Sequence, residues 1–181
     1  MIEAVNYPAS TTLKDGTTVT IRAIGKDDRG ALLAAFDNQD PESIYTRFFT
    51  YKRGLTETDL GQLTEANPDR VTALVVTTPI GQGEKLIGGG RYFLNIERHT
   101  AELAFMTDDA YRGRGIASLI LEHLVRIGRE HGVLMFEADV LAQNQVMLGV
   151  FRRSGLPMEK RSAGNVVHVK LALSVDGSPS P

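Results

Sequence analysis

Residues 112–118 of this 181-residue chain read Arg-Gly-Arg-Gly-Ile-Ala-Ser, and they join a strand pattern to a helix pattern. The strand pattern covers residues 101–107. The helix pattern covers residues 116–131, where polar side chains four residues apart form one stripe and most of the rest are apolar. Glycines let main-chain N–H groups approach a ligand closely, and a helix start presents unpaired donors with a partial positive charge. With two arginines to pair with phosphate oxygens, the stretch predicts a phosphate site.

Two other interpretations of this stretch stay open. The glycines could form only a tight turn, with the arginines solvated. Alternatively, Gly113 and Gly115 fit part of a dinucleotide-binding fingerprint, with Ser118 in place of the third glycine and Asp139 near the position of the ribose-binding acid. Against that fingerprint, five residues separate Thr107 from Gly113, where the dinucleotide fold turns tightly. The phosphate-binding P-loop pattern, GxxxxGK followed by Ser or Thr, is absent.

The rest of the chain predicts a mixed α/β sheet in one domain. Residues 1–16 read as a loose lead-in, 17–173 as the domain and 174–181 as a flexible tail. Residues 79–85 read as a Gly-rich turn, and Gly88 to Gly90 weaken the strand that follows it. Hydrophobic periodicity and capping residues place the other strands near 17–24, 71–77, 86–94, 133–140 and 165–173, and the other helices near 27–36, 40–49, 56–63 and 144–154.

Composition excludes several classes of protein. The absence of cysteine excludes disulfides, cysteine-ligated zinc and a covalent intermediate on a thiol. The 20 basic and 22 acidic residues give no basic excess of the kind that nucleic-acid-binding proteins carry. No apolar run approaches the roughly 18 residues of a membrane span, and residues 1–10 lack the apolar core of a signal peptide. We therefore expect a cytoplasmic protein whose partners include neither nucleic acid nor membrane.

Residues 112–118 resemble the pyrophosphate loop of the GNAT superfamily of acetyl-CoA-dependent N-acetyltransferases. That loop has the pattern [Q/R]-x-x-G-x-[G/A], which Arg112, Gly115 and Ala117 match. The strand pattern over 101–107 also corresponds to the strand that precedes the loop in this family. The resemblance covers roughly residues 17–173 and implies the GNAT fold, an α/β arrangement with a mixed, mostly antiparallel sheet flanked by helices.

Other segments strengthen and refine this resemblance. Residues 144–156 resemble the family's downstream N-x6-Y-x3-G-F element, with Phe151 at the tyrosine position. Three segments are similar to the GNAT domain of bacterial Pat-type protein lysine acetyltransferases: 12–17 (Thr-Leu-Lys-Asp-Gly-Thr), 43–49 (Ser-Ile-Tyr-Thr-Arg-Phe-Phe) and 138–144 (Ala-Asp-Val-Leu-Ala-Gln-Asn).

The GNAT resemblance implies an acetyl-CoA site. In the family, the backbone of the strand before the loop pairs with the acetyl and pantetheine amides, and the loop amides hold the pyrophosphate. Asn144 would hydrogen-bond near the pantetheine or would only cap a helix, and Phe151 would pack against the pantetheine. The residues that this resemblance assigns to acetyl-CoA binding are Phe105, Met106, Thr107, Arg112, Gly113, Arg114, Gly115, Ile116, Ala117, Ser118, Asn144 and Phe151.

Acetyl transfer to an amine needs a base, because a lysine of pKa about 10.4 is protonated at pH 7 and neutralising it costs about 4–5 kcal/mol. Glu102 is the first candidate, since Pat-like domains have a glutamate at this offset from the loop. The alternative is that Glu102 simply faces solvent on its strand. Asp139 is the reserve candidate for the base.

Phe151 departs from the family pattern, because the tyrosine that many relatives have at this position protonates the leaving thiolate. Coenzyme A can leave as a thiolate, and without cysteine we expect direct transfer through a ternary complex. We expect a protein lysine as the acceptor, with a small amine as the second reading and a non-catalytic acyl-CoA sensor as the third. The four histidines show no metal-ligand spacing, so no metal is expected.

Overall fold

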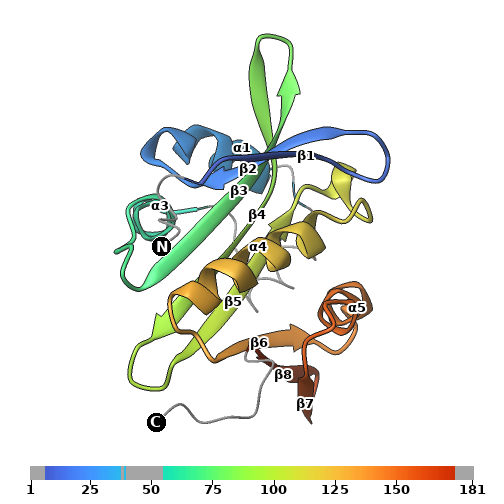
Figure 1. Cartoon of the computed structure of the whole chain (residues 1–181). Coiled ribbons are helices and arrows are strands. Elements are labelled where there is room, and N and C mark those ends of the chain that lie inside the picture. The colour runs from blue at the N-terminus through green and yellow to red at the C-terminus, as the bar shows by residue number, and fades with distance from the viewer. Residues whose placement is uncertain (1–6, 38, 40–54, 174–181) are drawn as a thin grey trace.

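An eight-stranded sheet with helices on both faces forms the frame of the molecule, and a computed structural model describes it over residues 7–37, 39 and 55–173 (Figure 1). The strand order is β1-β2-β3-β4-β5-β6-β8-β7. The elements are β1 (Ala9–Thr12), β2 (Thr18–Ala23), the 3-10 turn η2 (Lys26–Asp28), α1 (Arg29–Asp37), α3 (Glu57–Thr64), β3 (Val71–Ile80), β4 (Gly83–Asn95), β5 (Thr100–Thr107), the 3-10 turn η3 (Asp109–Tyr111), α4 (Ile116–Glu130), β6 (Met135–Leu141), α5 (Gln145–Arg153), β7 (Met158–Ala163) and β8 (Val166–Ala172).

The sheet is mixed and mostly antiparallel. Among the described strands, only β5 and β6 run parallel to each other. This arrangement confirms the predicted fold class. It also removes the dinucleotide-binding interpretation, because that fold needs a mostly parallel sheet.

Helix α4 covers one face of the sheet and carries the main core. Its apolar stripe includes Ile116, Ile120 and Leu124, which are all almost fully buried. The helix lies diagonally across the central strands in Figure 1. After it, Gly132 adopts φ 73°, a left-handed conformation that ends a helix at low cost for glycine. The sequence predicted both the helix and this terminator.

Two glycines of β4 set how closely α4 approaches the sheet. A Cβ atom added at Gly88 would lie 2.5 Å from Ile116 Cγ2, and one added at Gly90 would lie 2.5 Å from Ile120 Cγ2. The sequence analysis treated this glycine run as a weakness in the strand. Their function in the fold is different, because the missing side chains make room for the first two turns of α4.

Helices α1 and α3 cover part of the other face. Leu32 of α1 and Leu60 of α3 form a second buried cluster with Val75 and Leu86 of the sheet. The predicted capping box starts α3, since the Thr56 side chain accepts a bond from the Asp59 amide and Asp59 bonds back to the Thr56 amide. Among the described helices, none combines the length and the apolar composition that crossing a bilayer requires.

Three parts of the sequence prediction were wrong. Residues 9–12, assigned to the lead-in, form β1 and pair with β2. The hairpin of β3 and β4 extends through the predicted turn at 79–85 and turns only at Gly81 and Gln82, because Gly81 takes φ 56° there. Strand β7 was missed because it is a sheet edge, and its mostly exposed, polar residues lack apolar alternation. The predicted helix at 40–49 and the tail at 174–181 lie outside the described residues.

Candidate acetyl-CoA and acceptor site

The two parallel strands of the sheet diverge after a short contact. The ladder between β5 and β6 joins Thr100–Glu102 to Met135–Glu137 and, among the described residues, ends there. On its other edge, β5 stays paired with β4 as far as Thr107. The edge of β5 beyond Glu102 therefore presents main-chain groups that no described strand uses. An extended ligand that contains amides can pair with such an edge.

The three residues predicted to line this edge differ in their surroundings. Phe105 is half-buried and faces α5, where its ring meets that of Phe151 edge-on at a centroid distance of 6.0 Å. Met106 packs from the opposite face of the sheet against the cluster beneath α1 and α3. The Thr107 carbonyl accepts a 3.3 Å bond from the side-chain amide of Gln39. The three side chains have different surroundings, but all three residues lie on the stretch of β5 whose second edge no described strand pairs with. This agrees with a role in main-chain pairing.

The loop between β5 and α4 ends in two left-handed glycines. Gly113 has φ 73° and Gly115 has φ 89°, conformations that other residues adopt only with strain. Gly115 is the N-cap of α4 and has no side chain with which to bond the first-turn amides. The N–H groups of Ile116, Ala117 and Ser118 therefore start a 15-residue helix without a side-chain cap. Together with the helix dipole, they suit the oxygens of a pyrophosphate.

Both arginines of the loop are engaged by carboxylates. Arg112 lies 2.6 Å from an Asp109 oxygen. Arg114 lies 2.9 Å from Asp15, which stands in the turn between β1 and β2, and it also donates to the Ala110 carbonyl. The local excess of positive charge that the sequence suggested is thus partly compensated. The uncapped amides are the groups best placed to take the phosphate charge.

A second set of contacts holds the base of the loop. The buried Asp108 lies 2.9 Å from Lys85 Nζ, and its side chain also accepts a bond from the Ala110 amide. The Tyr111 ring contacts two cations, with Lys85 Nζ 5.1 Å and Arg114 Cζ 4.7 Å from its centroid. The loop is therefore tied to β4 at one end and to the β1–β2 turn at the other.

Glu102 stands where the two strands begin to diverge, and its exposed side chain lies on the face of α3. There it lines a pocket of about 570 Å³ together with Arg91, Phe93 and Ala104 of the sheet. Phe93 is the cross-strand partner of Glu102 and is 50 % exposed, so an aromatic surface adjoins the carboxylate. The geometry gives Glu102 an open pocket on one side and the free edge of β5 next to it.

Asp139, the reserve candidate, is differently placed. It lies on β6, two residues beyond the point where that strand leaves β5. Its carboxylate is 2.7 Å from Nδ1 of His168, its partner on β8, and it does not line the pocket around Glu102. Because this carboxylate already has a close partner, the position favours Glu102 as the base.

Asn144 and Phe151 flank the diverging strands from α5. The Asn144 side chain accepts a 3.1 Å bond from the Met147 amide and so caps α5, as one of the two predicted roles required. Phe151 is 1 % exposed, so protein atoms cover its ring. In this conformation it supports Phe105 from behind. Phe105 therefore lies between Phe151 and the free edge of β5, and Phe151 could influence a ligand there only by positioning Phe105.

Sequence reasoning missed Arg91 and Phe93. Both lie on β4, the strand whose three consecutive glycines predicted a weak strand, and neither belongs to a motif. The only sequence signal for them is the two-residue period of a strand, which places Gly89, Arg91 and Phe93 on one face of β4. That face could be recognised as the Glu102 face only after the register of β4 against β5 was known.

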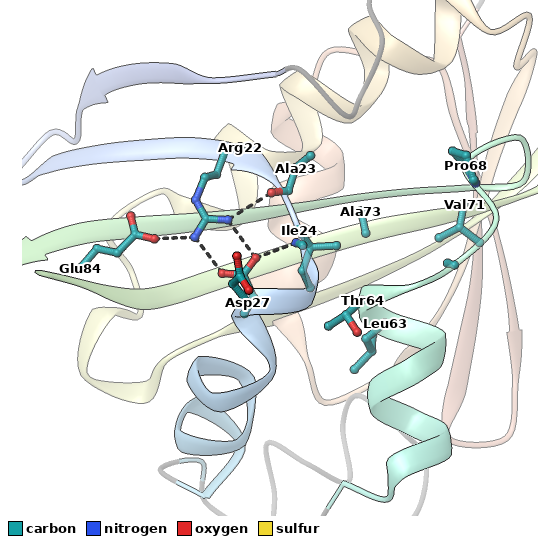
Figure 2. Close-up of a pocket in the computed structure, with 13 residues that line it drawn as sticks. Arg22, Ala23, Ile24, Asp27, Leu63, Thr64, Pro68, Val71, Ala73 and Glu84 are labelled. Carbon is teal, nitrogen blue, oxygen red and sulfur yellow. Dashed lines mark hydrogen bonds and ion pairs between the residues drawn. The ribbon is translucent and has the colours of Figure 1, made fainter.

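A second pocket, of about 540 Å³, lies between η2 and α3 and shares Ala66 and Val71 with the first (Figure 2). Its charged centre is Arg22, which bonds both oxygens of the buried Asp28 at 2.8 and 2.9 Å and also pairs with Glu84. The Asp28 carboxylate accepts bonds from Arg22 and from the Gly25 main-chain amide. Burial alone would raise the pKa of Asp28, but the bonds from Arg22 and Gly25 outweigh it and lower that pKa. These charges are satisfied within the protein.

Replacing Asp28 with Asn is expected to lower the free energy of unfolding by about 1.5–3 kcal/mol at neutral pH, because two charge-assisted bonds to Arg22 are lost. The folded-state pKa of Asp28 lies below its ordinary value of 3.8. Its stabilisation is therefore complete above that pH and is lost as the pH falls through the folded-state pKa. Urea unfolding at neutral pH and near pH 2–3 measures this. The exposed neighbour Asp27 gives the control Asp27→Asn, and a deficit for Asp28→Asn that does not shrink in acid would contradict the assignment.

The part of the chain that matches a known family includes strands β3 to β6, the loop before α4 and α4 itself. Residues 35–156 match the Acetyltransferase (GNAT) family. The chain belongs to this family. GNAT acetyltransferases use acetyl-CoA, and the diverging strands with the uncapped helix start are the features of this chain that fit it.

Individual relatives agree with the GNAT assignment. The crystal structure of the GNAT domain of S. lividans PAT is 31 % identical, with a TM-score of 0.82 over 91 % of this chain and 96 % of that one. Acetyltransferase PA5475 of Pseudomonas aeruginosa is 24 % identical over 75 % of this chain and 73 % of its own length. YncA of Salmonella typhimurium, a putative acetyltransferase solved with its cofactor acetyl-CoA, shares the fold at 16 % identity, with a TM-score of 0.70 over 90 % of this chain and 98 % of that one.

Proposed function

We propose that this GNAT acetyltransferase transfers the acetyl group of acetyl-CoA directly to the side-chain amine of a protein lysine, with Glu102 as the base. The pocket around Glu102 carries the proposal, because it brings an exposed carboxylate, an exposed aromatic ring and the free edge of β5 together. The similarity to the S. lividans PAT domain supports a Pat-type acceptor. An aromatic ring such as Phe93 suits the methylenes and the cation of a lysine side chain.

The proposed step uses the residues of this chain as follows. The edge of β5 around Phe105 to Thr107 aligns the pantetheine arm, and the first amides of α4 hold the pyrophosphate. Glu102 accepts the proton of the lysine ammonium, directly or through water. The neutral nitrogen then attacks the thioester carbonyl and its C–N bond forms. The C–S bond breaks, coenzyme A leaves as thiolate, and the second proton of the nitrogen passes to that thiolate or to solvent, which leaves a neutral amide. The chain has no cysteine, so the acetyl group does not pass through a protein thiol.

An acceptor panel tests the lysine assignment. We expect kcat/KM for lysine-containing peptides or unfolded proteins to exceed that for polyamines, amino acids and aminoglycosides by at least about tenfold, because the open pocket and Phe93 fit a lysine side chain that projects from a larger surface. Release of the coenzyme A thiol, followed with a chromogenic disulfide, measures all the acceptors in one assay. Faster transfer to a small amine would contradict the proposal. So would tight acetyl-CoA binding without transfer to any amine, which would point to a sensor.

A further inference from the structure

Arg91 is one of the charged residues of the Glu102 pocket that the proposed chemistry does not use, together with Glu65 and Arg70. It lies in the middle of β4, on the same face as Glu102 and two residues from Phe93. Its neighbours across the ladders are Ala73 on β3 and Ala104 on β5. Two alanines leave space beside the arginine, and its side chain lines the pocket.

The guanidinium of Arg91 has no ion-pair or hydrogen-bond partner among the residues that the structure describes. Arg22 makes an instructive contrast, because it lies on the same face of the sheet and pairs with two carboxylates. Glu102 acts on Arg91 only at longer range than a salt bridge. Burial lowers the pKa of Arg91 and the Glu102 carboxylate partly offsets this, so Arg91 is a partly desolvated cation that lacks a close counter-ion.

A cation in this state favours an anion from outside the protein. Guanidinium binds carboxylate through two parallel N–H···O bonds, and partial desolvation strengthens the pair. Arg91 is diagonal to Glu102 on the neighbouring strand. Such positions are about 7–8 Å apart. One acceptor can therefore place its amine at Glu102 and a carboxylate at Arg91 at the same time.

We propose that Arg91 binds a carboxylate of the acceptor, so that the enzyme prefers an amine with an anionic group within reach of it. This inference rests on the proposed function, since it takes the Glu102 pocket as the acceptor site. In a protein substrate the carboxylate comes from an aspartate or glutamate beside the target lysine. In a small acceptor it is the α-carboxylate of the same molecule.

Two matched pairs of acceptors test the inference. The first pair is a terminally blocked peptide with Glu beside its lysine and the same peptide with Gln. The second pair is Nα-acetyl-lysine and its carboxamide. We expect the acidic member of a pair to have about tenfold higher kcat/KM than its neutral partner, mainly through a lower KM. The peptide pair shows this difference if the natural acceptor is a protein, and the Nα-acetyl-lysine pair shows it if the natural acceptor is a small molecule. In Arg91→Gln this preference should fall to less than about twofold, and Arg91→Lys should restore part of it.

Arg98→Gln provides the matched control, because Arg98 is exposed in the β4–β5 turn and does not line the pocket. The acetyl-CoA Kd and the melting temperature of Arg91→Gln should equal those of the wild type. Equal rates for both members of both pairs in the wild type, or a preference that survives in Arg91→Gln, would overturn the inference.

The design separates this inference from the proposed function. If Nα-acetyl-lysine is acetylated and the peptides are not, the protein-lysine function fails while the small pair still tests Arg91. If no amine is acetylated, calorimetric binding of the same pairs to the protein saturated with coenzyme A reads out the preference without catalysis. Binding of the acidic member alone, lost in Arg91→Gln, supports the carboxylate site, and equal binding of both members excludes it.

Discussion

Replacing Glu102 with Gln is expected to lower kcat/KM for acetyl transfer by a factor of about 10²–10⁴, while the Kd for acetyl-CoA stays within about twofold. Gln keeps the size of the side chain but does not accept the ammonium proton at neutral pH. Acetyl-CoA affinity should persist, because the β5 edge and the start of α4 lie in other segments of the site. Steady-state thiol release and calorimetry with acetyl-CoA measure the two quantities separately.

Two further variants make this result specific. Glu122→Gln removes a carboxylate from the exposed side of α4, across the sheet from the pocket, and should leave the rate unchanged. Asp139→Asn should have a small effect, because that carboxylate is bonded to His168 away from the pocket. Near-normal turnover in Glu102→Gln would show that Glu102 is not the base. If Asp139→Asn then lost activity, the base would be Asp139.

Replacing Gly88 with Val is expected to destabilise the fold by about 3 kcal/mol and to weaken acetyl-CoA binding by tenfold or more. Even the first added atom would lie 2.5 Å from Ile116 Cγ2 and 3.3 Å from the Met106 carbonyl oxygen. Ile116 is the first residue of α4, so relief of the clash must move the helix start whose amides are proposed to hold the pyrophosphate. At roughly 2–4 °C per kcal/mol for a domain of this size, the melting temperature should fall by about 6–12 °C.

The two effects of Gly88→Val are separated by measuring binding well below the melting temperature. Gly30→Ala is the matched control, because a Cβ at this position in α1 meets nothing within 4 Å and should be neutral or slightly stabilising. A Gly88→Val protein that melts like the wild type and binds acetyl-CoA normally would show that α4 can shift without consequence. That result would remove the link between glycine spacing and the loop.

Local patterns were enough to predict much of the fold. The stripe of α4, its glycine terminator and the capping box at Thr56 are all consequences of residues close together in sequence, and the structure confirms them. Edge strands are different, because β1 and β7 are stabilised on one side only and their residues are mostly exposed. The length of the β3–β4 hairpin depends on pairing across the sheet, which composition does not encode.

The candidate site also combines features that neighbouring residues determine with features that depend on contacts between distant segments. The loop glycines and the Asn144 cap could be predicted, because backbone conformation at a helix start depends on few residues. The Asp15 partner of Arg114 could not, since Asp15 lies far away in the sequence. Arg91 and Phe93 become part of the site only through the register of β4 against β5. The roles of all these residues in binding and catalysis stay predictions.

The ties that hold the loop at residues 108–115 have a consequence for the thermodynamics of binding. Lys85, Asp15 and the Tyr111 ring fix the loop through contacts within the protein. Its conformational entropy is therefore lost when the chain folds and not when the ligand arrives. Association then requires little rearrangement of this segment, and the phosphate interactions contribute to affinity with little ordering cost. In the proposed site, the same ion pairs that partly neutralise the arginines would hold the amides of α4 in place before the phosphates bind.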